Sequence, residues 1–288
     1  MTADDRTARE SDKGILHPGE QARHRSLHRL APGPVVGEFV EWYWVVRWDL
    51  RGQPLYRAEV LPFPCVNVSF ESSEQRTGGF VNGVYTTKFT RELTGLGTTF
   101  GVRFRAGGFG AFTGVDVGSL RDRAVPLGEV FPDAGDLVGE VLCAESDERK
   151  RALVEAYLGG RIGRAEDDTY RLVRRIVYAM EHDRALTRVD QVTERFGVPV
   201  RTVQRMFRRY VGAGPKWVLR RYRLQDGAQL LARGRVADLA ALAVELGYFD
   251  QAHFSREFTA EIGMPPLEYA RHSLAAARDL PVRAEAVS

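Results

Sequence analysis

A repeat near the C-terminus constrains the fold of this chain more than any other feature. Two similar segments follow one another there, at residues 192–215 and 243–266. Gly197 and Gly247 occupy equivalent positions 50 residues apart, whereas Arg205 and Arg256 are 51 residues apart. The repeat therefore predicts two copies of one local structure, with a turn that is one residue longer in the second copy.

Each copy has the pattern of a helix-turn-helix. A short helix ends at a glycine, which suits a left-handed C-terminal cap, and a second helix begins three or four residues later. In the first copy, Val203 and Phe207 are four residues apart on this second helix. Phe254 and Phe258 repeat the spacing in the second copy. Side chains at this spacing share one helix face, so we expect both pairs to face a hydrophobic core.

The opposite face of each second helix predicts a surface that reads DNA bases. Recognition helices lie in the major groove with their N-terminal residues against base edges, where Arg suits guanine and Gln suits adenine. Ala252 cannot hydrogen-bond a base but can touch a thymine methyl, and His253 has the alternative of a surface histidine without a specific contact. The predicted base-reading residues are Arg201, Gln204, Arg205, Gln251, Ala252, His253 and Arg256.

One long helix is predicted between the two copies, from Pro215 to Arg233. Proline suits the first turn of a helix, and an apolar stripe follows at Trp217, Leu224, Ala228 and Leu231. Such a helix spans roughly 25 Å, near the ~34 Å between successive major grooves. It is therefore expected to hold both recognition helices rigidly.

Charge is distributed unevenly along the chain, whose formal net charge is +3. Residues 169–272 contain 18 Lys/Arg and 11 Asp/Glu, a net charge of +7, and the remainder has a net charge of −4. A basic part joined to an acidic part is typical of a nucleic-acid-binding domain fused to another domain. Two alternatives are a solvated helix face and a module that binds a protein. Salt-dependent DNA affinity would distinguish the last from a DNA-binding domain.

The N-terminal part is predicted to be rich in β-strands. Residues 41–48 are aromatic and β-branched, and Trp42, Trp44 and Trp48 share one face at period two. Further short runs at 65–70, 80–85 and 98–104 predict a small barrel or sandwich. The tryptophans form either a packed core or an aromatic ligand pocket. Arg103 and Arg105 share a face, and they either hold a ligand carboxylate or pair with acids on a solvent side.

Enzyme classes find little support in the sequence. A catalytic metal site of the kind found in small β-barrels needs clustered His and carboxylate ligands, yet none of the six histidines lies within residues 35–125. Nucleophile elbows and phosphate loops are not recognised either. We therefore expect a non-enzyme without catalytic residues, metal or cofactor.

Other features indicate a cytoplasmic protein. The chain has no apolar run of ~18 residues, and its first 20 residues lack the apolar stretch of a secretory signal. No membrane association is therefore expected. Cys65 and Cys143 both lie in apolar surroundings and are predicted to be buried free thiols.

Residues 170–272 resemble the AraC family of bacterial transcription regulators. The likeness rests on the string 204–207, the Arg223-Leu224 pair, the turn 246–248 and a closing Gly-x-x-Pro in each copy. One departure is Gly227, where the family usually has Ala. The resemblance implies that both recognition helices read bases, and that phosphates are contacted by Arg208, Arg209 and Lys216.

The N-terminal part is similar, more loosely, to the cupin-like sensor domains that precede such units, most of all at residues 101–109. This resemblance implies an effector-binding domain, a dimerisation domain, or both, and contact with RNA polymerase. The candidate ligand residues, chosen from the strand pattern described above, are Trp42, Trp44, Arg103 and Arg105.

The expected fold is therefore α+β, with a β-rich cupin-like barrel followed by an all-α domain of two helix-turn-helix units joined by a long helix. The expected function is regulation of transcription through double-stranded DNA, modulated by a small molecule or by homodimerisation. The predicted divisions are a disordered tail (1–26), a β-rich sensor or dimerisation domain (27–132), a helical linker region (133–165), a DNA-binding domain (166–274) and a second tail (275–288).

Overall fold

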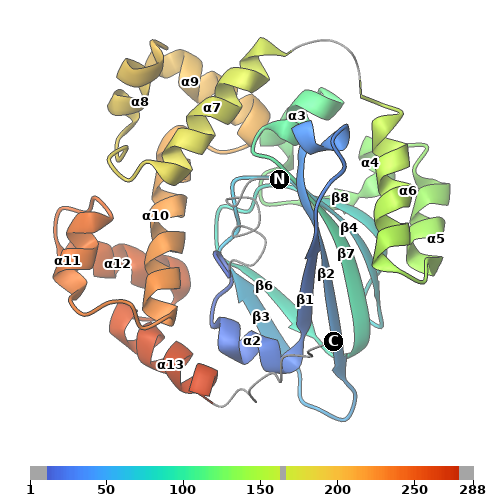
Figure 1. Cartoon of the computed structure of the whole chain (residues 1–288), viewed down its shortest axis with the longest axis horizontal. Helices are drawn as coiled ribbons and strands as arrows, with labels where there is room; N and C mark the ends of the chain where they lie inside the picture. The colour runs from blue at the N-terminus through green and yellow to red at the C-terminus, as the bar shows by residue number, and fades with distance from the viewer. Residues whose placement is uncertain (1–11, 163–166, 279–288) are drawn as a thin grey trace, which may run out of the picture.

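The computed structural model describes residues 12–162 and 167–278. A β-rich N-terminal part lies beside a helical C-terminal part, as Figure 1 shows. This confirms the predicted α+β class, with two helix-turn-helix units joined by a long helix. No helix of the described residues is long and apolar enough to cross a membrane.

The N-terminal strands form two antiparallel sheets. The first has the order β1 (Ser26–Leu30), β2 (Val40–Leu50), β7 (Gly95–Phe104), β4 (Asn67–Ser73), β5 (Thr77–Asn82) and β8 (Ala124–Pro126). The second pairs β3 (Tyr56–Val60) with β6 (Phe89–Leu93). Within the described residues, the hydrogen-bonded ladders leave these as two sheets rather than one closed barrel.

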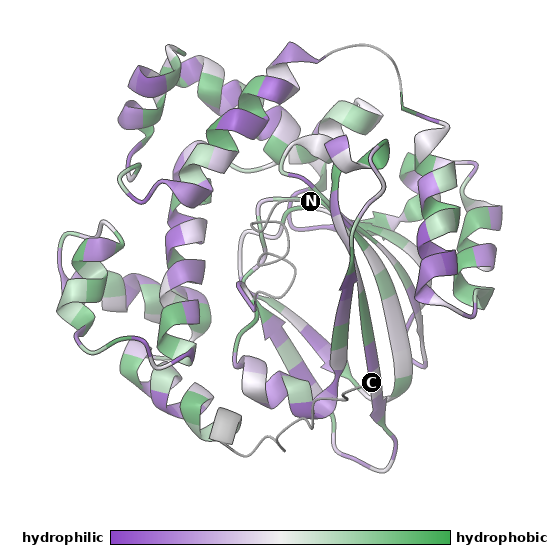
Figure 2. Ribbon diagram, in the orientation of Figure 1, coloured by the Kyte–Doolittle hydropathy of each residue, from purple (hydrophilic) through white to green (hydrophobic). Residues whose placement is uncertain are grey.

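The long strand β2 is covered on both faces over most of its length. Tyr43 and Val45 point into a core that is completed by α5 (Gly135–Cys143) and α6 (Asp147–Gly159) on the outer face of the sheet. The tryptophans of β2 occupy the other face, toward the second sheet. Figure 2 shows the hydrophobic residues distributed along these strands and on α5 and α6. Because both faces are covered, the run Trp42–Val46 is continuously apolar or aromatic in sequence.

Short elements complete the N-terminal part. They are α2 (Pro18–His24), η1 (Val36–Glu38), α3 (Gly108–Thr113), η2 (Val117–Leu120) and α4 (Leu127–Val130). The predicted helical linker region contains α5 and α6, which pack on the sheet and on each other. The predicted boundary between 165 and 166 falls between the end of α6 and the start of α7 (Asp168–His182), and residues 163–166 lie outside the described part.

The prediction of a disordered tail over residues 1–26 is wrong for residues 12–26. This segment pairs with β3 through Ile15, forms α2, and continues into β1. Leu16 is 1% exposed, and the Gln21 amide donates to the carbonyl oxygen of Leu16 at 2.8 Å. Partners distant in sequence therefore bury a segment of polar composition. Residues 1–11 lie outside the described residues, and residues 275–278 of the second predicted tail belong to α13.

The C-terminal helices follow the predicted repeat. The first unit contains α8 (Val189–Phe196), α9 (Val200–Met206) and a π-helical turn, η3 (Phe207–Val211). The linking helix α10 (Pro215–Ala232) leads to α11 (Leu239–Glu245), α12 (Gln251–Ile262) and α13 (Pro266–Arg278). Gly197 and Gly247 have φ values of 64° and 74°, the left-handed conformation predicted for the turns. The four predicted core residues are each 0% exposed: Val203, Phe207, Phe254 and Phe258.

The N-terminal part contacts both helix-turn-helix units. In the first unit, η2 packs against η3, and Val117 lies so close to Gly212 that a Cβ there would be 2.9 Å from its Cγ1. In the second unit, Lys88 Nζ donates to the carbonyl oxygen of Ile262, at the end of α12, at 2.9 Å. The two units are thus held relative to one another by α10 and by the N-terminal part together.

Candidate nucleic-acid interface and ligand pocket

The outer face of α9 is exposed along the predicted recognition surface. Arg201, Gln204 and Arg205 are exposed, whereas Val203 and Met206 are buried on the opposite side. Among the residues that the structure describes, none hydrogen-bonds or forms an ion pair with the side chains of these three exposed residues. Their donors are therefore available to an external partner.

The helix α12 presents the corresponding face of the second unit. The Asp250 side chain caps this helix by accepting from the backbone N–H of His253 at 2.6 Å. Gln251, Ala252, His253 and Arg256 are all exposed. The His253 ring lies edge-on to Tyr248, and its Nε2 is 3.9 Å from a Glu257 oxygen. His253 is thus partly engaged within the protein, and the alternative of a histidine without a base contact stays open.

Several arginines elsewhere in the same domain form ion pairs with acids. Arg195 pairs with Asp183, and Arg220 Nε lies 2.8 Å from Glu257 Oε1. Arg184 pairs with Glu245. The charges of these three arginines are therefore compensated within the protein, in contrast to those of Arg201 and Arg205.

The three residues assigned to phosphates by resemblance are also exposed. Arg208 and Arg209 lie on η3, and Lys216 lies in the first turn of α10. The N-terminal part approaches this region closely, since a Cβ on Gly118 would be 3.1 Å from the Arg208 carbonyl oxygen. Their position beside the first recognition helix is compatible with contacts to the DNA backbone.

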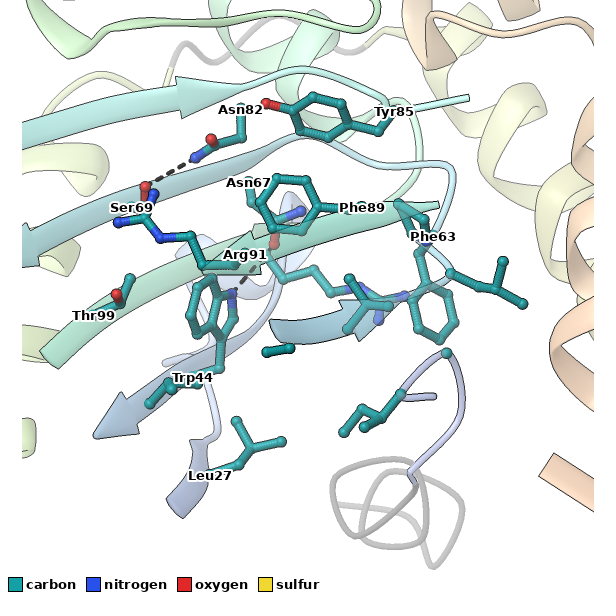
Figure 3. A pocket seen from close by; sticks show the side chains of 18 of the residues that line it. Leu27, Trp44, Phe63, Asn67, Ser69, Asn82, Tyr85, Phe89, Arg91 and Thr99 are labelled. Atoms are coloured by element: carbon teal, nitrogen blue, oxygen red, sulfur yellow. Dashed lines mark hydrogen bonds between the residues drawn. The ribbon is translucent and has the colours of Figure 1, made fainter. Parts of the chain in front are cut away.

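A cavity of about 260 Å³ lies between the two sheets. The tryptophans of β2 form one wall, and Ala58, Phe89 and Leu93 of the second sheet form part of the opposite wall. Figure 3 shows Trp44, Phe89 and Phe63 directed into this space. The predicted tryptophan stripe therefore does line a pocket, which was one of the two alternatives, although Trp42 and Trp48 are also largely buried.

Two glycines of β7 make room for the indole rings. A Cβ on Gly101 would lie 2.0 Å from Trp44 Cε2, and a Cβ on Gly97 would lie 2.1 Å from Trp48 Cζ2. The rings therefore lie flat across the neighbouring strand, which widens the cavity above them. Any larger residue at either position would push an indole out of place.

Polar groups are gathered at the first sheet. Trp44 Nε1 donates to Asn67 Oδ1 at 3.2 Å, and Asn82 Nδ2 donates to Ser69 Oγ at 2.9 Å (Figure 3). The Ser69 hydroxyl donates to Glu71, whose other oxygen lies 2.9 Å from Arg91. An apolar chamber with a few fixed polar groups is the usual form of a small-molecule site.

The two arginines predicted to hold a ligand are separated by their contacts. Arg103 Nε lies 2.8 Å from Glu41, and its guanidinium stacks 4.0 Å from the Trp42 ring centroid. Arg105 Nε donates instead to the carbonyl oxygen of Gly37 at 2.9 Å. Only Arg103 lines the aromatic cavity, where its charge is already matched by a carboxylate.

Sequence reasoning missed most of the polar lining. Asn67 and Ser69 are two residues apart in a predicted strand, so the alternation already indicated that they share one face of the sheet. Phe89 and Arg91 lie on β6, a strand that the sequence did not predict, so no sequence pattern indicated that they line the cavity. A further cation, Arg29, lines the cavity, where burial and the charge of Arg103 lower its pKa to about 10.

The cysteine prediction is half correct. Cys65 is buried, and burial raises the pKa of its thiol to about 11. Cys143 is exposed, contrary to expectation. It is the last residue of α5, whose buried side carries Leu137 and Val141, so an apolar neighbourhood in sequence did not place the thiol inside.

Residues 85–89 connect the cavity with the helical domain. Tyr85 and Phe89 line the cavity. Between them, the Thr86 carbonyl oxygen accepts from Trp217 Nε1 at 3.1 Å and from Arg221 at 2.6 Å. Lys88 reaches the end of α12, as described above. One short segment thus touches both candidate sites.

Comparisons with known proteins match the N-terminal and the C-terminal part of the chain separately. A helix-turn-helix domain family matches residues 192–272, and a domain family of unknown function (DUF6597) matches residues 28–126. An AraC-like protein of Streptomyces lividans is 37% identical over 71 residues, which cover 25% of this chain and 23% of that protein. The transcriptional activator RhaS of Escherichia fergusonii is 29% identical over 103 residues, or 36% of this chain and 37% of RhaS. The chain thus spans less than half of either relative's length.

Among solved structures, ToxT from Vibrio cholerae aligns with a TM-score of 0.39 and 11% identity, over 86% of this chain and 97% of ToxT. A structure of ToxT bound to an unsaturated fatty acid aligns with a TM-score of 0.36 and 8% identity, over 85% and 94% of the two chains. Likenesses at these TM-scores carry no information about a ligand of this chain.

Proposed function

The C-terminal region is a helix-turn-helix domain of the AraC type, and from this premise we propose that the chain regulates transcription by binding specific duplex DNA sequences. The observation that supports the proposal most strongly is the pair of exposed recognition faces. Their Arg and Gln side chains have no partner in the described residues, whereas Arg195 and Arg220 of the same domain form ion pairs with acids.

In this proposal, α9 and α12 enter successive major grooves. The 18 residues of α10 span about 27 Å at 1.5 Å per residue, so the helix is of the length needed to separate two such readers. Arg205 and Arg256 suit guanine, and Gln204 suits adenine. Arg208, Arg209 and Lys216 neutralise phosphates, which supplies affinity without sequence preference.

Selection of sites from a random duplex library by the full chain, at two salt concentrations, tests this proposal. We expect a motif of two blocks about one helical turn apart, and affinity that falls steeply with salt. A failure to enrich any sequence, together with salt-independent binding of a protein partner, would assign the recognition faces to protein recognition instead.

Single substitutions distinguish base contacts from phosphate contacts. Arg205→Ala is expected to weaken binding to the selected site by about 5- to 150-fold, corresponding to 1–3 kcal/mol, and to relax one base position. Arg209→Ala should weaken all sequences alike and reduce the salt dependence. Arg149→Ala removes an equal charge from exposed α6 and serves as the control. Equal changes in specificity for the first two variants would contradict this assignment of the faces.

The cavity between the sheets is proposed to bind an effector. Its apolar walls and its polar groups at Asn67, Ser69 and Asn82 favour a small organic molecule with a ring-sized apolar body and a hydrogen-bonding group. A carboxylate held by Arg103 and Arg105 is not favoured, because these side chains are engaged elsewhere.

Residues 85–89 are proposed to transmit the effector signal. A ligand that displaces Tyr85 or Phe89 also moves Thr86 and Lys88, which contact α10 and α12. Binding at one site then changes affinity at the other, and the two affinities change by the same factor.

Filling the cavity tests the effector site. Ala58 lines it, whereas Arg57 on the same strand is exposed, so Ala58→Phe and Arg57→Phe are matched variants. We expect Ala58→Phe alone to abolish binding of the fluorescent probe anilinonaphthalenesulfonate. Equal probe binding by the two variants would refute the site.

Lys88→Ala should retain probe binding but reduce the effect of the probe on DNA affinity. Homodimerisation and contact with RNA polymerase stay predictions from the resemblance.

A further inference from the structure

Three side chains with metal-ligating atoms meet where α2 packs against α13, away from both sites described above. The Nδ1 atoms of His17 and His272 are 3.3 Å apart, and His272 Nδ1 is 3.8 Å from Glu20 Oε2. One ligand atom from each residue lies within 4.8 Å of the others. We propose that His17, Glu20 and His272 form a binding site for a divalent transition-metal ion of the zinc type.

The separation of these atoms suits such an ion. Zinc binds His nitrogen and carboxylate oxygen at about 2.0–2.1 Å in a tetrahedral arrangement, which places neighbouring ligand atoms about 3.3 Å apart. The two imidazole nitrogens already have this separation. Glu20 is partly exposed, so its carboxylate can rotate to close the remaining distance. Two histidines and one carboxylate leave a fourth position for water or for the Ser273 hydroxyl, which lies 3.0 Å from His17 Nδ1.

The backbone of His17 gives independent support. This residue has φ 48° and ψ 55°, in the left-handed region, and it precedes Pro18. A side chain with a Cβ disfavours the left-handed region, and a following proline favours an extended conformation. Strained residues of this kind concentrate at ligand sites. Here the strain directs a ring that is only 8% exposed toward α13, against Tyr269 at a centroid distance of 4.6 Å.

An ion at this site would join two distant parts of the chain. Glu20 lies on α2, which packs on β1 and β2, and His17 is the residue that precedes this helix, whereas His272 lies on α13, the last helix of the second helix-turn-helix unit. The site would therefore tie the second unit to the N-terminal part. A metal site here departs from the expectation of a chain without metal, which was argued from the lack of histidine in residues 35–125. The proposed metal site does not depend on the proposed DNA-binding function.

The alternative is a hydrogen bond between two neutral imidazoles, which also accounts for the short nitrogen–nitrogen distance. Titration of the tag-free, chelator-stripped full chain with Zn²⁺ and with Co²⁺ separates the two. A metal site predicts one equivalent of Zn²⁺ bound at micromolar concentration or below, and the intense visible absorption of tetrahedral Co²⁺. Zn²⁺ should also raise the melting temperature by several degrees, because it binds only the folded chain.

His272→Ala and Glu20→Gln are the test variants, and His182→Ala, which removes an exposed histidine of α7, is the control. His272 is largely exposed, so its replacement is expected to leave the circular dichroism spectrum unchanged. We expect His272→Ala to weaken Zn²⁺ binding at least ~100-fold and to lose the Co²⁺ band, and Glu20→Gln to weaken binding less. The control should match the original chain. Equal Zn²⁺ affinity in His272→Ala and the original chain, or no stoichiometric binding by either, would overturn the proposal.

Discussion

Gly227 of the linking helix α10 faces Phe254 of the second recognition helix, α12. A Cβ at this position would be 3.0 Å from Leu246 Cδ1 and 3.3 Å from two ring atoms of Phe254. Both neighbours are buried, and Phe254 is 0% exposed. Glycine inside a helix costs about 1 kcal/mol relative to alanine. Glycine is nevertheless required here because the side chains of Leu246 and Phe254 lie against the backbone of α10.

Replacement of Gly227 by Ala therefore sets two effects against each other. Helix propensity contributes about 1 kcal/mol of stability. Overpacking a filled core by one methyl group costs about 1–3 kcal/mol, because the Phe254 ring has little room to move. We expect a net loss of about 1 kcal/mol in the free energy of unfolding.

Gly139→Ala is the matched control. Gly139 is exposed on α5, and a Cβ there would meet no atom within 4 Å. This substitution should gain the propensity term alone and stabilise the chain by up to ~1 kcal/mol, so the two variants are expected to differ by about 2 kcal/mol. The assay is urea unfolding followed by far-ultraviolet circular dichroism and by tryptophan fluorescence.

DNA binding gives a second measurement on the same pair. A displaced Phe254 moves α12, so Gly227→Ala should weaken recognition of the half-site read by α12 and leave the half-site read by α9 unchanged. If Gly227→Ala stabilised the chain as much as Gly139→Ala does, the crowding between α10 and α12 would be refuted.

The remaining predictions concern the N-terminal part. At pH 8, a thiol-reactive reagent should modify one thiol of the folded chain, because Cys143 is exposed whereas Cys65 is buried with its pKa raised to about 11 and so carries almost no thiolate; two fast equivalents would show that Cys65 is accessible. Gly101→Ala should lower the free energy of unfolding by about 1–3 kcal/mol and change tryptophan fluorescence, because the new Cβ would overlap Trp44. An unchanged emission spectrum would show that the indole does not lie across this glycine.

The sequence by itself determined the architecture of the helical domain. Gly197 and Gly247 mark left-handed turns, and the pairs at 203/207 and 254/258 mark core faces, because capping and helical periodicity are properties of residues only a few positions apart. The same local rule assigned the opposite, exposed faces to recognition, and those side chains are indeed exposed. Their contacts with individual bases stay predictions.

Only the tertiary structure decided how the remaining segments are used. Residues 12–26 have a polar composition typical of a tail, yet Leu16 is buried in the core of the second helix-turn-helix unit, whose residues lie more than 200 positions away. The tryptophan stripe is compatible with a core or with a pocket in sequence. It lines a pocket because the second sheet, β3 and β6, lies opposite it and because the glycines of β7 leave room for the indole rings. The grouping of His17 and Glu20 with His272 has the same origin. In each case the partner is distant along the chain, so local periodicity and composition contain no information about it.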